Sequence, residues 1–234
     1  TPEGITAYWF GGSREGARDV QIYSASYTNN QWEIPRAIIN REKVTSDLNR
    51  YIRKLGNPVS YRFSNGKIWL FFVSVSIGGW GGSSINMIES NDEGITWSKT
   101  KRLVTSPFFN ISNLVRNKPI EYQDGTIGLP IYHEFLSKFG EIIRLDESGK
   151  IIDKIRISHG NSTLQPTIVA KSDSDAMIFL RNAGDKPRRI VKLETSDSGH
   201  SWNKMDALDL PNPNAAIDAI SFQNQILLVF NNTV

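Results

Sequence analysis

The chain has 234 residues, no cysteine and a formal net charge of +3, with 27 Lys and Arg against 24 Asp and Glu. This length suits one all-β domain with a sizeable core, and the globular composition excludes a coiled coil and a disordered chain. Without cysteine, a disulfide scaffold, thiol catalysis and cysteine-bound zinc are excluded, while a secreted, periplasmic or cytoplasmic location stays open. The interspersed charges form no basic stripe of the kind that binds nucleic acid, and no apolar run approaches the roughly 18 residues of a membrane span.

Short apolar runs at a regular spacing predict β-strands along the whole chain. The runs are, in chain order, residues 7–10, 68–72, 127–132, 176–180 and 226–230. Asn65-Gly66 and Asp124-Gly125 stand just before the second and third run, and such dipeptides are typical of β-hairpin turns. Only residues 45–55 carry a weak helical period, so the sequence predicts an all-β fold.

A second motif repeats in phase with these strands. Residues 90–97 read Ser-Asn-Asp-Glu-Gly-Ile-Thr-Trp, and residues 195–202 read Thr-Ser-Asp-Ser-Gly-His-Ser-Trp. Residues 145–152 look like a worn copy, with an acidic residue two before Gly149 and Ile in the Trp position, and residues 25–32 like a fourth, with Asn29 in the Gly position. A repeat of about 50 residues with two hairpins predicts the blades of a β-propeller, with a β-sandwich as the alternative.

Each residue of this motif has a structural use. The Asp side chain accepts hydrogen bonds from turn amides, the Gly takes a positive φ, and the Trp supplies a large buried surface. The motif is therefore expected to stabilise the fold rather than to touch a ligand.

The motif resembles the Asp box, or BNR repeat, of sialidase-like propellers. Residues 9–20, Trp-Phe-Gly-Gly-Ser-Arg-Glu-Gly-Ala-Arg-Asp-Val, resemble the Trp-Phe-Gly-Gly-Thr-Arg-Glu-Gly-Ala-x-Asp-Val signature of bacterial predicted neuraminidases. The segments that begin at 56, 117, 164 and 210 resemble that family's blade starts, so the resemblance covers essentially the whole chain. It implies a six-bladed sialidase-type propeller, with residues 1–234 as a single domain incomplete at both ends.

Polar residues at the starts of the inner strands indicate where a ligand would bind. Four residues of different polar types hold the same place in successive units: Asn57, Lys118, Gln165 and Asp218. A purely structural need would repeat one residue type, so these four indicate a shared binding site. Trp80 lies in a Gly-rich segment at 78–82, which suits either a sugar-stacking platform or a packed tryptophan. The candidate substrate-binding residues are Arg14, Asn57, Trp80, Lys118, Gln165, Arg181, Asn214 and Asp218.

The resemblance also implies catalytic roles. Asp19 matches the sialidase acid/base carboxylate, and Arg14 matches the arginine before it. Sialidases use a Tyr nucleophile activated by a Glu, and Tyr132 and Glu134 offer that pair on one face of one strand. Arg14 and Arg181 are candidates to grip a sugar carboxylate, which an arginine fork matches. The Phe-Arg-Ile-Pro segment that carries the family's first arginine is absent from the sequence.

Together these features predict a glycoside hydrolase that acts at an exo position on an acidic or heavily hydroxylated sugar. The alternatives are a non-catalytic carbohydrate-binding propeller, a lyase on uronate-containing polysaccharides, and a scaffold without a sugar site. The three histidines lie in different units without ligand spacing, so no metal and no cofactor is expected. The expected partner is a carbohydrate, with neither a nucleic acid nor a membrane span involved.

Overall fold

The computed structural model describes residues 4–160, 162–223 and 225–233, and within them the chain is all-β, as predicted. Two short helical elements interrupt the strands, the α-helix α1 (Arg41–Leu48) and the 3-10 turn η1 (Trp80–Gly82). No helix in the described residues is long and apolar enough to cross a membrane. The strands are β1 (Ile5–Gly11), β2 (Gln21–Thr28), β3 (Gln31–Trp32), β4 (Arg36–Ile39), β5 (Lys54–Arg62), β6 (Ile68–Val75), β7 (Ser83–Ser90), β8 (Lys101–Arg102), β9 (Leu114–Val115), β10 (Ile120–Glu121), β11 (Ile127–His133), β12 (Phe139–Leu145), β13 (Ile151–Arg156), β14 (Thr163–Ala170), β15 (Ala176–Asn182), β16 (Arg189–Thr195), β17 (Asn203–Pro211), β18 (Asp218–Phe222) and β19 (Gln225–Val229).

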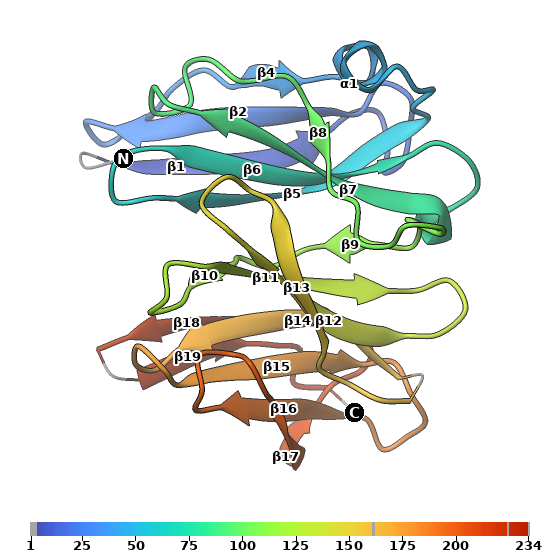
Figure 1. Ribbon diagram of the computed structural model, residues 1–234, viewed down its shortest axis with the longest axis vertical. Coiled ribbons are helices and arrows are strands. Elements are labelled where there is room, and N and C mark those ends of the chain that lie inside the picture. Colours follow the sequence, from blue (N-terminus) through green and yellow to red (C-terminus); the bar gives the residue numbers. More distant parts are fainter. Residues whose placement is uncertain (1–3, 161, 224, 234) are drawn as a thin grey trace. The chain divides into compact units, whose positions relative to one another are not determined.

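These strands pair antiparallel in chain order, and they belong to two compact units (Figure 1). The first unit, Thr1–Leu103 with Phe109–Val115, holds the sheet β1-β2-β3, in which β4 also pairs with β2, and the sheet β5-β6-β7-β8. The second unit, Val104–Phe108 with Arg116–Val234, holds β10-β11-β12-β13, β14-β15-β16-β17 and the pair β18-β19. In the sheets β5-β6-β7-β8 and β14-β15-β16-β17 each strand pairs with the next, which is the unit that the repeat predicts. The first sheet departs from it, because β4 pairs with β2 rather than with β3.

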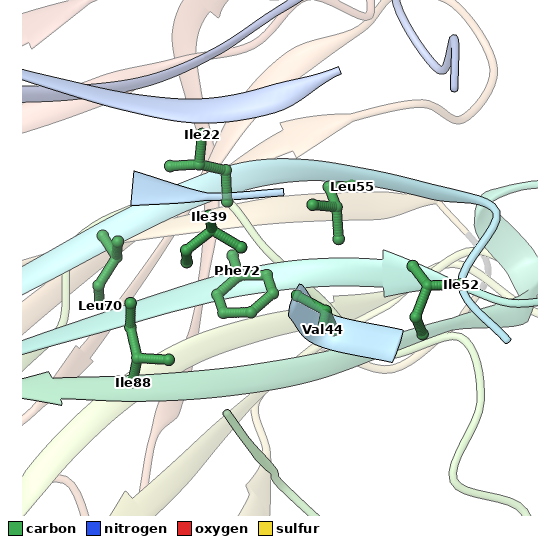
Figure 2. Close-up of a cluster of buried hydrophobic side chains, with 8 residues drawn as sticks. All are labelled: Ile22, Ile39, Val44, Ile52, Leu55, Leu70, Phe72 and Ile88. Atoms are coloured by element: carbon green, nitrogen blue, oxygen red, sulfur yellow. The ribbon is translucent and has the colours of Figure 1, made fainter. Parts of the chain in front are cut away.

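The core of the first unit lies between its two sheets, with α1 at one end (Figure 2). Strand β6 is buried along all eight residues, and Leu70 and Phe72 point from it toward Ile22 of β2 and Ile39 of β4. Fully burying one such side chain stabilises the fold by roughly 1.5–3 kcal/mol. The apolar run at 68–72 is therefore an inner strand because both of its faces are covered.

Helix α1 begins earlier than the sequence period indicates. The weak helical period of the sequence lies at 45–55, but the helix covers Arg41–Leu48, and β5 already begins at Lys54. The Asn40 side chain accepts a hydrogen bond from the Lys43 amide at 2.8 Å, and Asn49 ends the helix at φ 48°. Val44 is the one buried residue of the helix, so its two asparagine caps define it better than an apolar stripe does.

The turn at 90–97 joins the outer strands β7 and β8 through its aspartate. Asp92 accepts hydrogen bonds from the Thr96 hydroxyl at 2.6 Å, the Thr96 amide at 2.8 Å and the Ser90 hydroxyl at 2.7 Å. The Gly94 amide donates to Ser90 Oγ at 2.8 Å, and Gly94 has φ 83°. The hydrogen bonds from Thr96 and Ser90 lower the pKa of Asp92 to about 2, so the turn holds an ionised carboxylate.

The turn at 195–202 joins β16 and β17 with the same bonds. Asp197 accepts from the Ser201 hydroxyl at 2.6 Å, the Ser201 amide at 2.9 Å and the Thr195 hydroxyl at 2.7 Å, and Gly199 has φ 78°. Burial works to raise the pKa of Asp197, but the hydrogen bonds from Ser201 and Thr195 outweigh it and hold the value at about 2. Both turns act as folding devices, as expected.

A tyrosine and an arginine from the preceding sheet contact each of these turns. The Tyr8 hydroxyl lies against Gly94, and Arg36 donates to the Gly94 carbonyl. In the second unit the Tyr122 hydroxyl lies against the glycine of the turn, and Arg144 donates to the Ser198 carbonyl at 2.6 Å. Each turn therefore ties its own sheet to the sheet before it.

The predicted worn copy at 145–152 is a different turn. Its carboxylate is Asp146, three residues before Gly149 rather than two, and it accepts from the amides of Ser148 at 2.9 Å and Lys150 at 3.0 Å. Ile152, expected in the Trp position, is 52% exposed. The segment is a tight hairpin between β12 and β13 that needs no buried tryptophan. In the fourth copy, Asn29 does adopt the expected positive φ, at 51°.

Candidate functional site

Two inner strands carry the same irregularity at predicted site positions. Asn57 in β5 has φ 48° at a register shift between Gly56 and Val59, and Gln165 in β14 has φ 50° at a corresponding shift. Both residues precede a proline. Side chains other than glycine rarely adopt this conformation, and residues that do so cluster at functional sites. Asn57 and Gln165 therefore hold equivalent positions, as the repeat predicts.

Lys118 and Asp218 share the place in the sheet but not the backbone conformation. Lys118 is exposed just before β10, and Asp218 is the exposed first residue of β18. Asp218 accepts hydrogen bonds from the Thr167 hydroxyl at 3.1 Å and the Ala219 amide at 2.8 Å. The four residues thus share a position at the starts of inner strands, but of the four only Asn57 and Gln165 lie at a bulge with positive φ.

Four of the predicted residues form one hydrogen-bonded chain in the second unit. The Gln165 side-chain amide donates to Tyr132 Oη at 3.5 Å and accepts from Arg181 Nη1 at 3.1 Å. Arg181 Nε donates to Asn214 Oδ1 at 2.9 Å, and Asn214 itself has φ 60°. We call Tyr132, Gln165, Arg181 and Asn214 the tyrosine network. It links β11, β14, β15 and the loop before β18, so it exists only after two sheets and this loop have assembled.

The Tyr132 phenol keeps its proton at neutral pH. Tyr132 is 2% exposed, and burial raises its pKa to about 12. The Gln165 hydrogen bond and the charges of Arg116 and Arg181 work against this rise, while the Glu134 carboxylate adds to it. Glu134 follows the end of β11 directly and is close enough to act on the phenol. A nucleophilic Tyr132 would need a base, and Glu134 is the carboxylate nearest in sequence to supply one.

Arg116 and Asn117 complete this region, and sequence reasoning missed both. Arg116 Nη1 donates to Asn117 Oδ1 at 2.9 Å and to the Ile217 carbonyl at 3.2 Å. Asn117 is buried and donates to the carbonyls of Gln165 at 3.1 Å and Pro166 at 3.0 Å. The two residues hold the β14 bulge in place. The available signal was their position directly before Lys118 in a segment that resembles a family blade start.

A pocket of about 670 Å³ lies in the first unit around the other predicted catalytic residue. Its walls come from the loop between β1 and β2, the segment before β5 and the segment after β6. Arg14 and Asp19 were predicted for this site, whereas Tyr51 and Arg53 were not. The lining residues are Ser13, Arg14, Gly16, Ala17, Arg18, Asp19, Tyr51, Arg53, Ser76, Ile77 and Gly78, and we call this the arginine pocket.

The polar groups of the arginine pocket are unevenly matched. Asp19 Oδ2 accepts from the Ser13 amide at 2.8 Å, and Asp19 Oδ1 accepts from the Ser13 hydroxyl at 2.9 Å. The amide bond first, and then the hydroxyl bond, lower the pKa of Asp19, so its carboxylate is ionised at neutral pH. Arg14, Arg18 and Arg53 are exposed, and none of them forms an ion pair with a residue that the structure describes.

Trp80 is half-buried, with one edge of its ring packed on β5. A Cβ at Gly56 would come within 2.9 Å of Trp80 Cη2, and the Lys54 ammonium lies 4.1 Å from the ring centroid. A sugar that stacked on this face of the ring would have to displace Lys54.

Comparison with known proteins places this architecture in a family. Residues 3–234 match the BNR repeat-like domain. The chain belongs to this family. The match covers nearly all of the sequence, so it includes both the arginine pocket and the tyrosine network. A search among curated protein sequences gives no match.

The BNR repeat-like chain shares its fold with solved sialidase structures. The Hadza microbial sialidase Hz136 has a TM-score of 0.75 at 16% identity, covering 97% of this chain and 50% of that one. The K499G mutant of the NanB sialidase from Streptococcus pneumoniae has a TM-score of 0.74 at 12% identity, covering 97% and 54%. The intramolecular trans-sialidase from Ruminococcus gnavus has a TM-score of 0.73 at 13% identity, covering 93% and 71%. This chain thus spans about half the length of the first two, and identities this low show the fold alone.

His133 of the BNR repeat-like chain packs against its strand neighbours. His133 Nε2 lies 2.7 Å from Glu141 Oε2, and the His133 ring stacks on Phe139 with centroids 4.4 Å apart. Among the described residues, no three His, Asp or Glu side chains are grouped as metal ligands would be. The polar groups of the candidate site are arginine, tyrosine, amide and carboxylate side chains.

Proposed function

We propose that this BNR repeat-like chain is a glycoside hydrolase of the sialidase superfamily, acting at an exo position on an acidic or heavily hydroxylated sugar. In this proposal the sheets are blades of a six-bladed propeller. The tyrosine network is the observation that carries it. The buried Tyr132 phenol accepts a hydrogen bond from Gln165, which Arg181 fixes in turn, and Glu134 follows Tyr132 by two residues. Gln165 and Asn214 occupy positive-φ positions in this arrangement. A packing role alone gives no reason to join these residue types at strained backbone positions.

The proposed chemistry assigns a role to each catalytic candidate. Tyr132 Oη attacks the anomeric carbon as Glu134 takes the phenol proton, and the bond to the leaving oxygen breaks. A neutral nucleophile approaches an anionic sugar without charge repulsion. Asp19 gives a proton to the leaving oxygen and then takes one from the water that attacks the glycosyl intermediate. The bond from the anomeric carbon to Tyr132 Oη breaks in this second step, and the phenolate takes its proton back from Glu134. The ionised state of Asp19 in the free protein fits the second step, so the carboxyl gains a proton before the first.

The remaining candidates bind the substrate in this proposal. Arg14 contacts its anionic group, because a guanidinium fork pairs with a carboxylate through two hydrogen bonds, while Arg181 holds Gln165 and Asn214 in place. The exposed Lys118 adds positive charge, and Asp218 accepts hydrogen bonds from sugar hydroxyls. Asn57 and Asn214 present amide groups from positive-φ positions.

A glycan-array screen followed by turnover assays on the sugars that bind tests this function. Tyr132→Phe should lower turnover by at least about 100-fold, because it removes the nucleophile and keeps the ring. Tyr122→Phe is the matched control, since Tyr122 is also buried and its hydroxyl has no hydrogen-bond partner among the described residues. Unchanged turnover in Tyr132→Phe, or an equal loss in both variants, would contradict the proposal.

A second candidate is a carbohydrate-binding protein without turnover. One observation favours it: in the free protein Asp19 is ionised, so it carries no proton to give to a leaving oxygen. Binding on the array, with no product from any bound sugar after prolonged incubation, would support this candidate over the hydrolase.

A further inference from the structure

The charge of the arginine pocket is unbalanced. Three arginines and one aspartate line it, which leaves a formal charge of +2. The Asp19 carboxylate is already occupied by two hydrogen bonds from Ser13. Arg14, Arg18 and Arg53 have neither an ion pair nor a side-chain hydrogen bond to any described residue.

Neighbouring charges leave this excess in place. The Glu15 carboxylate acts on the Lys54 ammonium outside the lining, where it works against the lowering of the Lys54 pKa that burial causes. The lining residue Ser76 accepts a hydrogen bond from Arg50 Nε at 2.7 Å, which adds a fourth guanidinium behind the wall. The charge of Arg53, in turn, helps to lower the pKa of Lys54, after the larger effect of burial.

The backbone beside these arginines is hydrogen-bonded before any ligand binds. The Ala17 amide donates to the Arg14 carbonyl at 3.1 Å, and the Val20 amide donates to the Ala17 carbonyl at 3.4 Å. The Arg53 amide donates to the Val75 carbonyl at 2.8 Å, which fixes the start of β5 to the end of β6. A site whose backbone is already ordered loses less entropy when a ligand binds.

The walls also offer apolar surface. Tyr51 is 56% exposed and Ile77 is 81% exposed, and both line the pocket beside the arginines. A sugar ring presents a C–H face to such surface and polar groups at its edge. A volume of about 670 Å³ lies inside the usual range of roughly 300–1,000 Å³ for small-molecule sites.

We propose that the arginine pocket binds a saccharide with two anionic groups on adjacent sugar units, so that the substrate is a polyanionic glycan. Arg53 and Arg18 contact one anionic group and Arg14 the other, while Tyr51 packs on the ring between them. That the ligand is a saccharide rests on the proposed function. The double charge rests on the lining itself, because two anions would neutralise the +2 excess and one would not.

Calorimetric titration with defined sugars tests the double charge. The probes are α2,8-linked disialic acid and digalacturonic acid, their monomers sialic acid and galacturonic acid, and lactose as the neutral sugar. At least one dianionic probe should bind about 10-fold or more tightly than its own monomer, and lactose should not bind. Arg53→Gln and Arg18→Gln should each remove most of that preference. Lys101→Gln is the charge-matched control, since Lys101 is exposed on β8 and does not line the pocket.

The outcomes separate this inference from the proposed function. Equal affinity for dianion and monomer, binding of no probe, or a preference that survives Arg53→Gln would overturn the double-charge inference. Every titration is repeated with the Tyr132→Phe variant, because a binding measurement needs no turnover. A preference for the dianion without hydrolysis of any glycoside supports the inference and contradicts the hydrolase. Hydrolysis of singly charged glycosides without a dianion preference does the reverse.

Discussion

The tyrosine network and the arginine pocket use arginine in different ways. In the second unit, Arg181 donates to the side-chain oxygens of Gln165 and Asn214, and Arg116 donates to Asn117 and to a backbone carbonyl. In the first unit, Arg14 and its neighbours line an open pocket without a protein partner. A guanidinium whose hydrogen bonds are all internal positions other side chains, whereas an unpaired, hydrated one can exchange water for a ligand. The tyrosine network is thus expected to matter for stability, and the arginine pocket for affinity.

The largest expected effect is the loss of turnover in Asp19→Asn. The amide keeps the shape of the carboxylate but cannot exchange a proton, so turnover should fall by about 100- to 10,000-fold. Binding of the same sugar should change little, because the arginines of the pocket remain. The measurements are kcat for wild type and variant and the Kd of the bound sugar.

Asp173→Asn, at an exposed loop position, is the control for this substitution and should leave kcat unchanged. A loss of binding as large as the loss of kcat would show that Asp19 serves affinity rather than proton transfer.

The second expected effect is on stability, and it tests the contrast directly. Arg181→Met leaves the acceptors of Gln165 and Asn214 without their donor, which should lower the free energy of unfolding by about 2–3 kcal/mol. Arg53→Met removes a side chain without a protein partner and should change stability by less than about 0.5 kcal/mol. Urea unfolding of the two variants measures both. Equal losses would mean that Arg53 also holds the fold.

The turns were predictable from sequence because their bonds are local. Asp92 and Asp197 contact residues within four positions, so one short motif carries the whole turn. The same reasoning failed at Asp146, because a two-residue spacing and a three-residue spacing before glycine look alike when the tryptophan is lost. Helix α1 was displaced for a related reason: its caps Asn40 and Asn49 define it, and the apolar period does not.

The candidate site was predictable only as far as the repeat reaches. Gln165 and Asn57 follow from the phase of the inner strands, and the structure gives them the same φ. Arg53 lies directly before β5 and outside the repeated segment that holds Asn57. Its position relative to Arg14 depends on how β1 and β5 pack, which no local sequence pattern encodes. The connection of Tyr132 to Arg181 through Gln165 likewise depends on how two sheets pack, because these residues lie on β11, β14 and β15.

The third prediction compares the two bulges. Glycine relieves the positive φ at either position but adds freedom to the unfolded chain, so Asn57→Gly should be close to neutral, within about 0.5 kcal/mol. Gln165→Gly also removes the hydrogen bonds to Tyr132 and Arg181, and it should cost about 1–2 kcal/mol more. Thermal unfolding in parallel measures the difference. Matching losses at both positions would show that the tyrosine network adds nothing to stability beyond the bulge.

The smallest expected effect concerns the pH dependence of Asp19. The Ser13 amide and hydroxyl hold the pKa of Asp19 below its usual value, and Ser13→Ala removes the hydroxyl bond while the amide bond persists. The pKa of Asp19 should therefore rise toward its ordinary value. Asp19 must carry a proton to give it to the leaving oxygen, so activity is lost as the pH rises through that pKa, and the variant should keep its activity to a higher pH than wild type. The profile of kcat/KM against pH reports this shift, because it follows the groups of the free enzyme. Ser46→Ala, on the exposed face of α1, should leave the profile in place. An alkaline limb that stays still or moves to lower pH in Ser13→Ala would assign that ionisation to a group other than Asp19, and the catalytic role of the arginine pocket would be lost while its role in binding stands.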